Sequence, residues 1–157
     1  MTAQQVIIAS VASNAVALLL LLLSWKRENT ARILFSLLFI WAAIINWKTA
    51  HYSPGDYLDY SKYAIPLYKH IILGEFAKHI TGYVSCIAIG QLLIGLGLLS
   101  KDIIVKTACI GGILFLIAIA PLGTGSAFPF SITASVGLYL LYRHTFTKNI
   151  FGNNWLV

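Results

Sequence analysis

The residues best suited to acid–base chemistry in this chain are a carboxylate and an imidazole four positions apart. Glu75 and His79 have the spacing that places two side chains on one face of a helix. Such a pair can exchange protons or contribute metal ligands, and it can equally form an ion pair at a helix end near lipid headgroups. We take Glu75 and His79 as candidate catalytic residues, with the ion pair as the simpler interpretation, and we predict no metal site.

Two amide side chains lie within long apolar segments. Gln91 falls near the middle of one segment, and Asn46 lies toward the end of another. A buried amide without a partner is costly, so each must bond to another helix, to water or to a ligand. Hydrogen bonding between helices is the simpler interpretation, and donation to the carbonyl of a quinone or lipid is the alternative. Gln91 and Asn46 are therefore candidate ligand-binding residues, and quinone is the candidate cofactor. His51 and His70 are added as candidates because both fall at the outer face in the topology predicted below.

These residues belong to an unusually apolar chain. Of its 157 residues, 59% are hydrophobic and 10% are charged, and its mean hydropathy is +0.82. Average soluble proteins have roughly 45–50% apolar and about 25% charged residues. A soluble domain of this length cannot bury so much apolar surface. The composition therefore predicts an integral membrane protein in contact with a lipid bilayer.

Uncharged segments divide the chain into transmembrane helices. A helix crosses the roughly 30 Å hydrocarbon core with about 20 residues. The uncharged run 107–142 is too long for one crossing, and its Gly- and Pro-rich part, 121–129, predicts a turn or re-entrant loop. We predict an all-α, polytopic bundle of five spans, the last of them short. The expected spans are 6–25, 32–48, 79–100, 103–120 and 128–143.

Basic residues at the ends of these spans predict the orientation. Arg32 and Lys48 flank the second span, and their long side chains can reach the headgroups. Five spans place one group of basic residues together on the cytoplasmic side, with the amino terminus outside. That group is Lys26, Arg27, Arg32, Lys101, Lys106, Arg143 and Lys148.

The outer loop 49–78 is the one sizeable polar segment. It is rich in tyrosine, whose amphipathic ring favours the membrane–water boundary. The pattern over 56–64 predicts a short interfacial helix, and a lid over a substrate site is the alternative.

The formal charge of +6 does not indicate nucleic-acid binding, because the basic residues lie at the ends of apolar runs. Cys86 and Cys109 lack the C-x-x-C spacing of a thiol oxidoreductase and are predicted to be buried apolar residues.

Four stretches carry a resemblance to a known family. They are Arg32-Ile-Leu-Phe-Ser-Leu-Leu-Phe-Ile-Trp41, Pro66-Leu-Tyr-Lys69, Ile87-Ala-Ile-Gly-Gln-Leu-Leu-Ile-Gly-Leu-Gly-Leu-Leu99 and Gly125-Ser-Ala-Phe-Pro129. Through them the segment 31–143 resembles the DoxX-like family of small membrane proteins. The resemblance implies a four-helix core, to which the first span is an addition. Where the family commonly has a glutamate, this chain has Gln91, which leaves a hydrogen-bonding role and excludes proton transfer at that position.

The same resemblance implies association with redox complexes, a thiosulfate:quinone oxidoreductase subunit being one relative, and in a distant animal branch receptor-assembly chaperoning. We expect a non-catalytic subunit or assembly partner of a membrane redox complex, located in the bacterial inner membrane. Its expected partners are other membrane subunits or a second copy of the chain. The alternative is a quinone- or lipid-binding oxidoreductase subunit with an outer-face site, so the sequence leaves open whether the protein is an enzyme.

Overall fold

The computed structural model describes residues 3–126, 128–148 and 150. Within these residues the chain folds into helices without a strand, which confirms the predicted all-α class. The elements are α1 (Ala3–Lys26), α2 (Glu28–Tyr52), the 3-10 helix η1 (Pro54–Lys62), α3 (Pro66–Ile71), the π-helix η2 (Ile72–Phe76), α4 (Ile80–Leu98), α5 (Asp102–Ile119), the 3-10 helix η3 (Ala120–Ser126) and α6 (Phe130–Arg143).

Four segments of the described chain are long and apolar enough to cross a membrane. They are Ile7–Lys26, Glu28–Tyr52, Ile80–Leu98 and Asp102–Gly123. The helix expected to form a fifth span, α6, has 14 residues. At 1.5 Å per residue it extends about 21 Å, which is less than the thickness of the hydrocarbon core. Helix length therefore shows four candidate crossings, and the predicted count of five is not confirmed.

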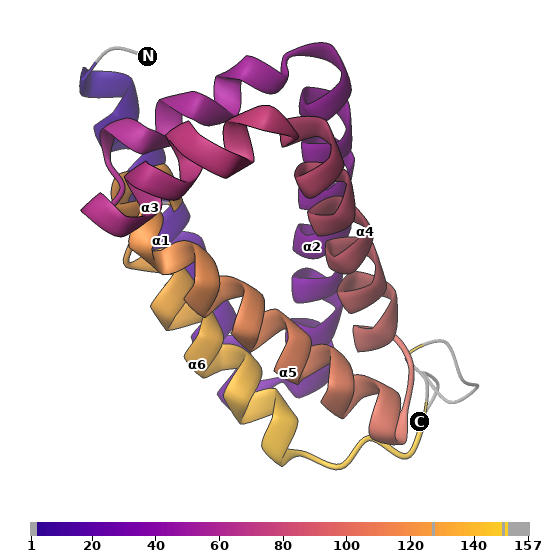
Figure 1. The fold of residues 1–157 in the computed structure, drawn as a ribbon. Helices are drawn as coiled ribbons and strands as arrows, with labels where there is room; N and C mark the ends of the chain where they lie inside the picture. Colours follow the sequence, from indigo (N-terminus) through magenta and orange to yellow (C-terminus); the bar gives the residue numbers. More distant parts are fainter. Residues whose placement is uncertain (1–2, 127, 149, 151–157) are drawn as a thin grey trace.

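The helices form two arms that converge at one end of the molecule. One arm consists of α2 and α4, which pack along each other, and the other consists of α1, α5 and α6 (Figure 1). The arms meet where Arg27 joins α1 to α2 and a short turn joins α4 to α5, and we call this the narrow end. They separate toward the opposite, wide end, where η1, α3 and η2 run across from one arm to the other. We call these three elements the crossing segment.

The main core fills the narrow end. Its fully buried members include Phe35, Leu98 and Leu138, which come from three different helices. Glycines permit the close approach of the helices: a Cβ on Gly112 would lie 2.7 Å from Leu138 Cδ1. A smaller cluster around Ala50 lies at the wide end. The space between the two arms is therefore filled by side chains at the narrow end, and the main core does not extend to the wide end.

Arg32 has a different environment from the one expected. Its side chain is 1% exposed and does not extend outward from a helix end. Its Nε donates to the carbonyl of Leu98 at 3.0 Å, and its Nη2 donates to the carbonyl of Ser100. Its guanidinium lies 4.1 Å from the centre of the Phe146 ring. The carbonyls at a helix end have no partner within the helix and attract a cation, so Arg32 caps α4 and fixes it to α2.

Two further expectations need correction. Cys109 is buried as predicted, but Cys86 is exposed on α4. The polar segment after α2 contains a run of short helices and not only the one expected over 56–64. The π-helix is interrupted at Gly74, whose φ of −98° and ψ of −107° are not helical.

Candidate functional site

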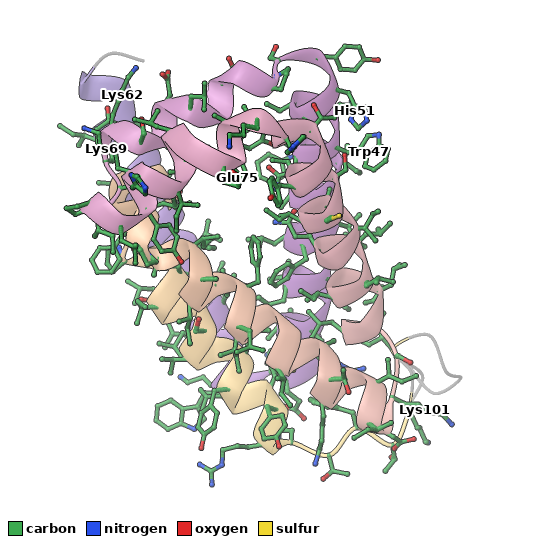
Figure 2. All side chains as sticks on the ribbon, in the orientation of Figure 1. Trp47, His51, Lys62, Lys69, Glu75 and Lys101 are labelled. Atoms are coloured by element: carbon green, nitrogen blue, oxygen red, sulfur yellow. The ribbon has the colours of Figure 1, made fainter. Side chains whose placement is uncertain are left out.

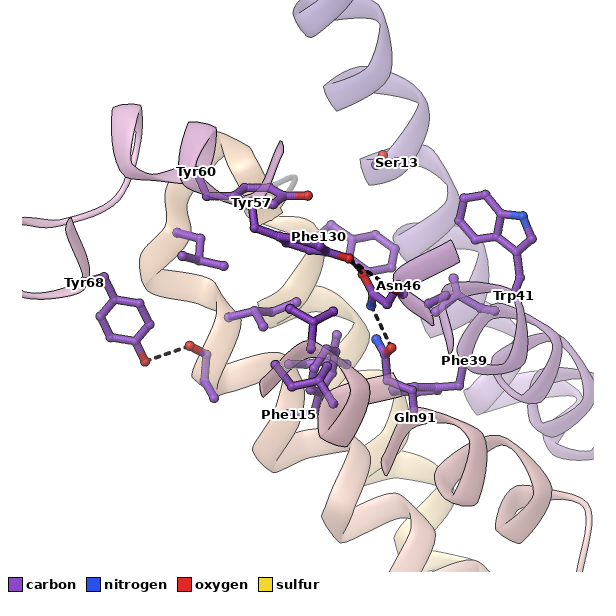
Figure 3. A pocket seen from close by; sticks show the side chains of 18 of the residues that line it. Ser13, Phe39, Trp41, Asn46, Tyr57, Tyr60, Tyr68, Gln91, Phe115 and Phe130 are labelled. Atoms are coloured by element: carbon purple, nitrogen blue, oxygen red, sulfur yellow. Dashed lines mark hydrogen bonds between the residues drawn. The ribbon is translucent and has the colours of Figure 1, made fainter. Parts of the chain in front are cut away.

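A cavity of about 820 Å³ lies between the two arms, beneath the segment that crosses the wide end (Figure 3). Its walls come from all of the long helices and are almost entirely apolar. Its volume falls in the range of pockets that hold small molecules, roughly 300–1,000 Å³. The aromatic side chains on its walls are Phe39, Trp41, Tyr57, Tyr60, Tyr68, Phe76, Phe115 and Phe130.

Three polar side chains form a hydrogen-bonded chain on one wall of this cavity. The hydroxyl of Tyr57 donates to Asn46 Oδ1 at 2.8 Å, and Asn46 Nδ2 donates to Gln91 Oε1 at 2.7 Å (Figure 3). These residues come from η1, α2 and α4, so the chain joins the crossing segment to both helices of one arm. The two amides that the sequence singled out are thus brought together, with Tyr57 as their third member.

The direction of these hydrogen bonds leaves one donor group unused. Gln91 accepts through its Oε1, and its Nε2 forms no hydrogen bond to any residue that the structure describes. Gln91 is 3% exposed and lines the cavity. Among the described residues, the fully buried side-chain polar atoms without a partner are Ser36 Oγ and Ser131 Oγ, so Gln91 Nε2 keeps some accessible surface on the cavity side. This amide group is therefore available to a ligand or water inside the cavity.

The electrostatics of the cavity favour an uncharged occupant. None of its described lining residues is acidic, basic or a histidine. Burial raises the pKa of Tyr57 to about 12, and burial also raises the pKa of Tyr60. Both phenols are therefore neutral near pH 7, and Tyr57 keeps the proton that it donates to Asn46. An ion in this cavity would lose its hydration without gaining a counter-charge.

Glu75 and His79 lie outside the cavity and do not share a helix face. The backbone of His79, just before α4, is not helical, with φ −139° and ψ 39°, so the helical turn that carries Glu75 ends before His79. The carboxylate of Glu75 instead pairs with Lys78, with a distance of 2.8 Å from Nζ to Oε2, and both side chains are exposed. The exposed ion pair of Glu75 is thus formed with Lys78 and is not the Glu75–His79 pair that the spacing favoured.

The two remaining candidate residues, His51 and His70, also do not line the cavity. The His51 ring stacks on Trp47 with centroids 4.6 Å apart, and both rings point away from the bundle (Figure 2). His70 is exposed on α3, beside a separate depression of about 390 Å³. The described residues contain no group of three His, Cys, Asp or Glu side chains that could hold a metal ion.

Sequence reasoning named no tyrosine among the site residues, although it gave a lid over a substrate site as the alternative for 56–64. Tyr57 and Tyr60 lie three positions apart in η1, which is one turn of a 3-10 helix, so both rings face the same way into the cavity. Tyr68 closes another side, where its hydroxyl donates to the carbonyl of Ala118 at 2.8 Å. The three-residue spacing was the available signal, but it does not distinguish a ring that faces the bundle from one that faces headgroups.

The fold and the site define a class: an all-helical bundle with four helices able to cross a membrane and an apolar internal cavity that carries one unused amide donor. Comparison of the chain with protein-family models, with curated proteins and with solved structures finds no significant match. The resemblance to the DoxX-like family stays a prediction.

Proposed function

We propose that this chain is an integral membrane protein that binds a lipophilic carbonyl compound, with quinones as the first class to test. The observation that carries the proposal is the buried Gln91 amide, whose Nε2 has no described partner and opens onto an apolar, uncharged cavity. A carbonyl oxygen supplies the missing acceptor without bringing a charge. Aromatic walls suit a flat ring, because stacked and edge-to-face contacts add to the burial of apolar surface.

The hydrogen-bonded chain orients the Gln91 donor. Because Asn46 donates to Gln91 Oε1, a rotation that exchanges the two ends of the Gln91 amide would bring two N–H groups together. The hydroxyl of Tyr57 donates to Asn46 Oδ1 and so stabilises this orientation of the Asn46 amide. The donor is thus held in position before the ligand binds, which reduces the ordering cost of binding. This role requires only hydrogen bonding, so no proton transfer is assigned to the cavity residues.

Binding is measured on protein in lipid nanodiscs through the fluorescence of Trp41, which lines the cavity and which a bound quinone quenches. Variants of the other tryptophans to Phe leave this single reporter. We expect saturable quenching by decylubiquinone, and about 5–10-fold weaker binding in Gln91→Leu, since one hydrogen bond contributes about 1 kcal/mol. Leu93→Ala, at a 65% exposed site on the same helix, is the matched control. Non-saturable quenching, or equal affinity in Gln91→Leu, would contradict the proposal.

The proposed topology has five crossings, with the amino terminus outside a bacterial inner membrane. The crossing segment at the wide end then lies outside, and the Lys101 end lies in the cytoplasm. In support, α6 packs against α1 and α5, so that a short helix completes the second arm. In a background without Cys86 and Cys109, a membrane-impermeant maleimide should label Tyr52→Cys from outside and Lys101→Cys only after lysis. Labelling of both from one side would refute this topology.

A second candidate function is that of a non-catalytic subunit or assembly partner of a membrane complex. On α4, Gly82, Cys86 and Gly90 recur every four residues, and a Cβ on either glycine would meet nothing within 4 Å. Such a small-residue face lets another transmembrane helix approach closely. Purification in a mild detergent followed by mass spectrometry should recover a partner chain or a homo-oligomer, and Gly90→Leu should release it. Isolation of a monomer from gently solubilised membranes would count against this role.

A further inference from the structure

The cavity reaches the outside of the bundle between α1 and α2. Ala12 and Val16 of α1 and Trp41 of α2 all line it, yet they are also exposed. Val16 is 43% exposed and Trp41 is 65% exposed. Figure 3 shows Trp41 beside α1, at the edge of the cavity opposite Tyr68. One side of the cavity therefore opens at the level of apolar helix segments, where a membrane protein meets lipid chains.

The opening follows from the way in which α1 leaves α2. One residue, Arg27, joins the two helices, so they lie close together only near the narrow end. Among the described side chains of α1, those that are buried are Ala17, Leu20 and Ser24, which all lie in its second half. At Ala12 and Val16 the helix has already separated from α2. The opening between α1 and α2 thus arises because the two helices diverge from their one-residue connection at the narrow end.

On the α4–α5 side of the cavity, side-chain contacts fix the crossing segment to both helices. Near the wide end, Tyr68 fixes α3 to α5 through its hydrogen bond to Ala118. On α4, the ring of Tyr83 stacks on Phe76 of the crossing segment, with centroids 5.8 Å apart. These contacts hold the crossing segment over the cavity on that side, although Ile87 and Ala118, which line the cavity there, are also exposed. Trp41, 65% exposed, is the most exposed large side chain of the lining, so the wider opening is on the α1–α2 side.

We infer that the cavity takes a chain-bearing lipid from the bilayer, with its carbonyl head at Gln91 and its aliphatic chain leaving between α1 and α2. This inference rests on the proposed function and narrows the ligand class. A compact, water-soluble ligand would have to pass the crossing segment, whereas a lipid reaches the opening by lateral diffusion. An uncharged head suits the cavity walls, and an aliphatic chain suits the apolar opening beside Val16.

The test compares two quinones that share one head group. Decylubiquinone carries an aliphatic chain, and its parent dimethoxy-methyl-benzoquinone does not. Both are titrated into nanodiscs that hold the full chain with Trp41 as sole reporter. Ala12→Phe narrows the α1–α2 opening, and Ala118→Phe places the same larger side chain at the α4–α5 wall. Val11→Phe is the control on α1, because Val11 is 66% exposed and does not line the cavity.

We expect Ala12→Phe to weaken decylubiquinone binding about five-fold or more and to leave the chain-free quinone within about two-fold. Ala118→Phe and Val11→Phe should leave decylubiquinone within about two-fold. If Ala12→Phe does not fold, Val16→Phe blocks the same opening. The inference is overturned if both quinones respond alike to Ala12→Phe, or if Ala118→Phe alone weakens decylubiquinone. If neither quinone shows Gln91-dependent quenching before the openings are altered, the proposed function itself has failed.

Discussion

Replacement of Arg32 by Met tests how the narrow end is held together. Met has a similar length and fills the space with apolar atoms, so the change removes hydrogen bonds more than volume. It leaves the carbonyls of Leu98 and Ser100 without their charged donor, and it removes the cation from the face of Phe146. Hydrogen bonds to a charged group contribute about 1.5 kcal/mol each and a cation–π contact about 1 kcal/mol, so the expected loss is about 3–4 kcal/mol.

Unfolding by SDS in mixed micelles, followed by far-UV circular dichroism, measures this loss. Arg27→Met is the matched control, because Arg27 is exposed and lies just before α2. Surface substitutions usually change stability by less than about 0.5 kcal/mol. Equal free energies of unfolding for the two variants would refute the assigned role of Arg32. A gain in stability for Arg32→Met would show that burial of the charge costs more than its contacts contribute.

Three further outcomes are expected. Because burial raises the folded pKa of Tyr57 from about 10 to about 12, the contribution of Tyr57 to stability is complete below pH 10 and is lost as pH rises toward 12. Tyr57→Phe should therefore flatten this part of an alkaline unfolding profile, and an unchanged profile would exclude Tyr57 as the source of the pH dependence. Gly95→Ala should lower stability by about 1–3 kcal/mol in the same SDS assay, because the added Cβ meets α2 backbone atoms at 3.1 and 3.3 Å, whereas Gly90→Ala should not, and equal effects would contradict the packing. N-ethylmaleimide should label Cys86 in the folded protein and Cys109 only after unfolding, and early labelling of Cys109 would contradict its burial.

The sequence predicted the helical class and the apolar segments because these depend on local composition. Runs of apolar residues bounded by charges specify where long helices begin and end, and the described structure has four such helices. Crossing of the membrane by α6 depends on more than its own composition. A helix of 14 residues can complete an arm by packing against α1 and α5, and helix length alone does not determine whether it crosses.

The candidate site was predictable only in part, because spacing along a chain does not specify which segments separate in space. Gln91 and Asn46 were singled out as amides in apolar surroundings, and the structure joins them. The Glu75–His79 spacing predicts a shared face only if one helix continues through both residues, and the non-helical backbone at His79 breaks it. The role of Tyr57 requires the crossing segment to lie over the cavity, which is a tertiary arrangement without a local sequence signal.

Arg32 shows the same limit for a charged residue. Its position at the start of an apolar run predicts a side chain that reaches the headgroups, and that interpretation holds for many such residues. Here α4 ends beside it, and the unpaired carbonyls at that helix end provide a better environment than water. The partner lies 66 positions away in the sequence, so no local pattern indicates it.

The most direct test of the central claim is an experimental density map of the protein in nanodiscs that contain decylubiquinone. The proposed function predicts density for a ring within hydrogen-bonding distance of Gln91 Nε2, beneath Tyr57, and the inferred lipid ligand predicts continuous density for its chain between α1 and α2. Arms that close on each other without a cavity, or a cavity that stays empty at saturating quinone, would contradict the claim.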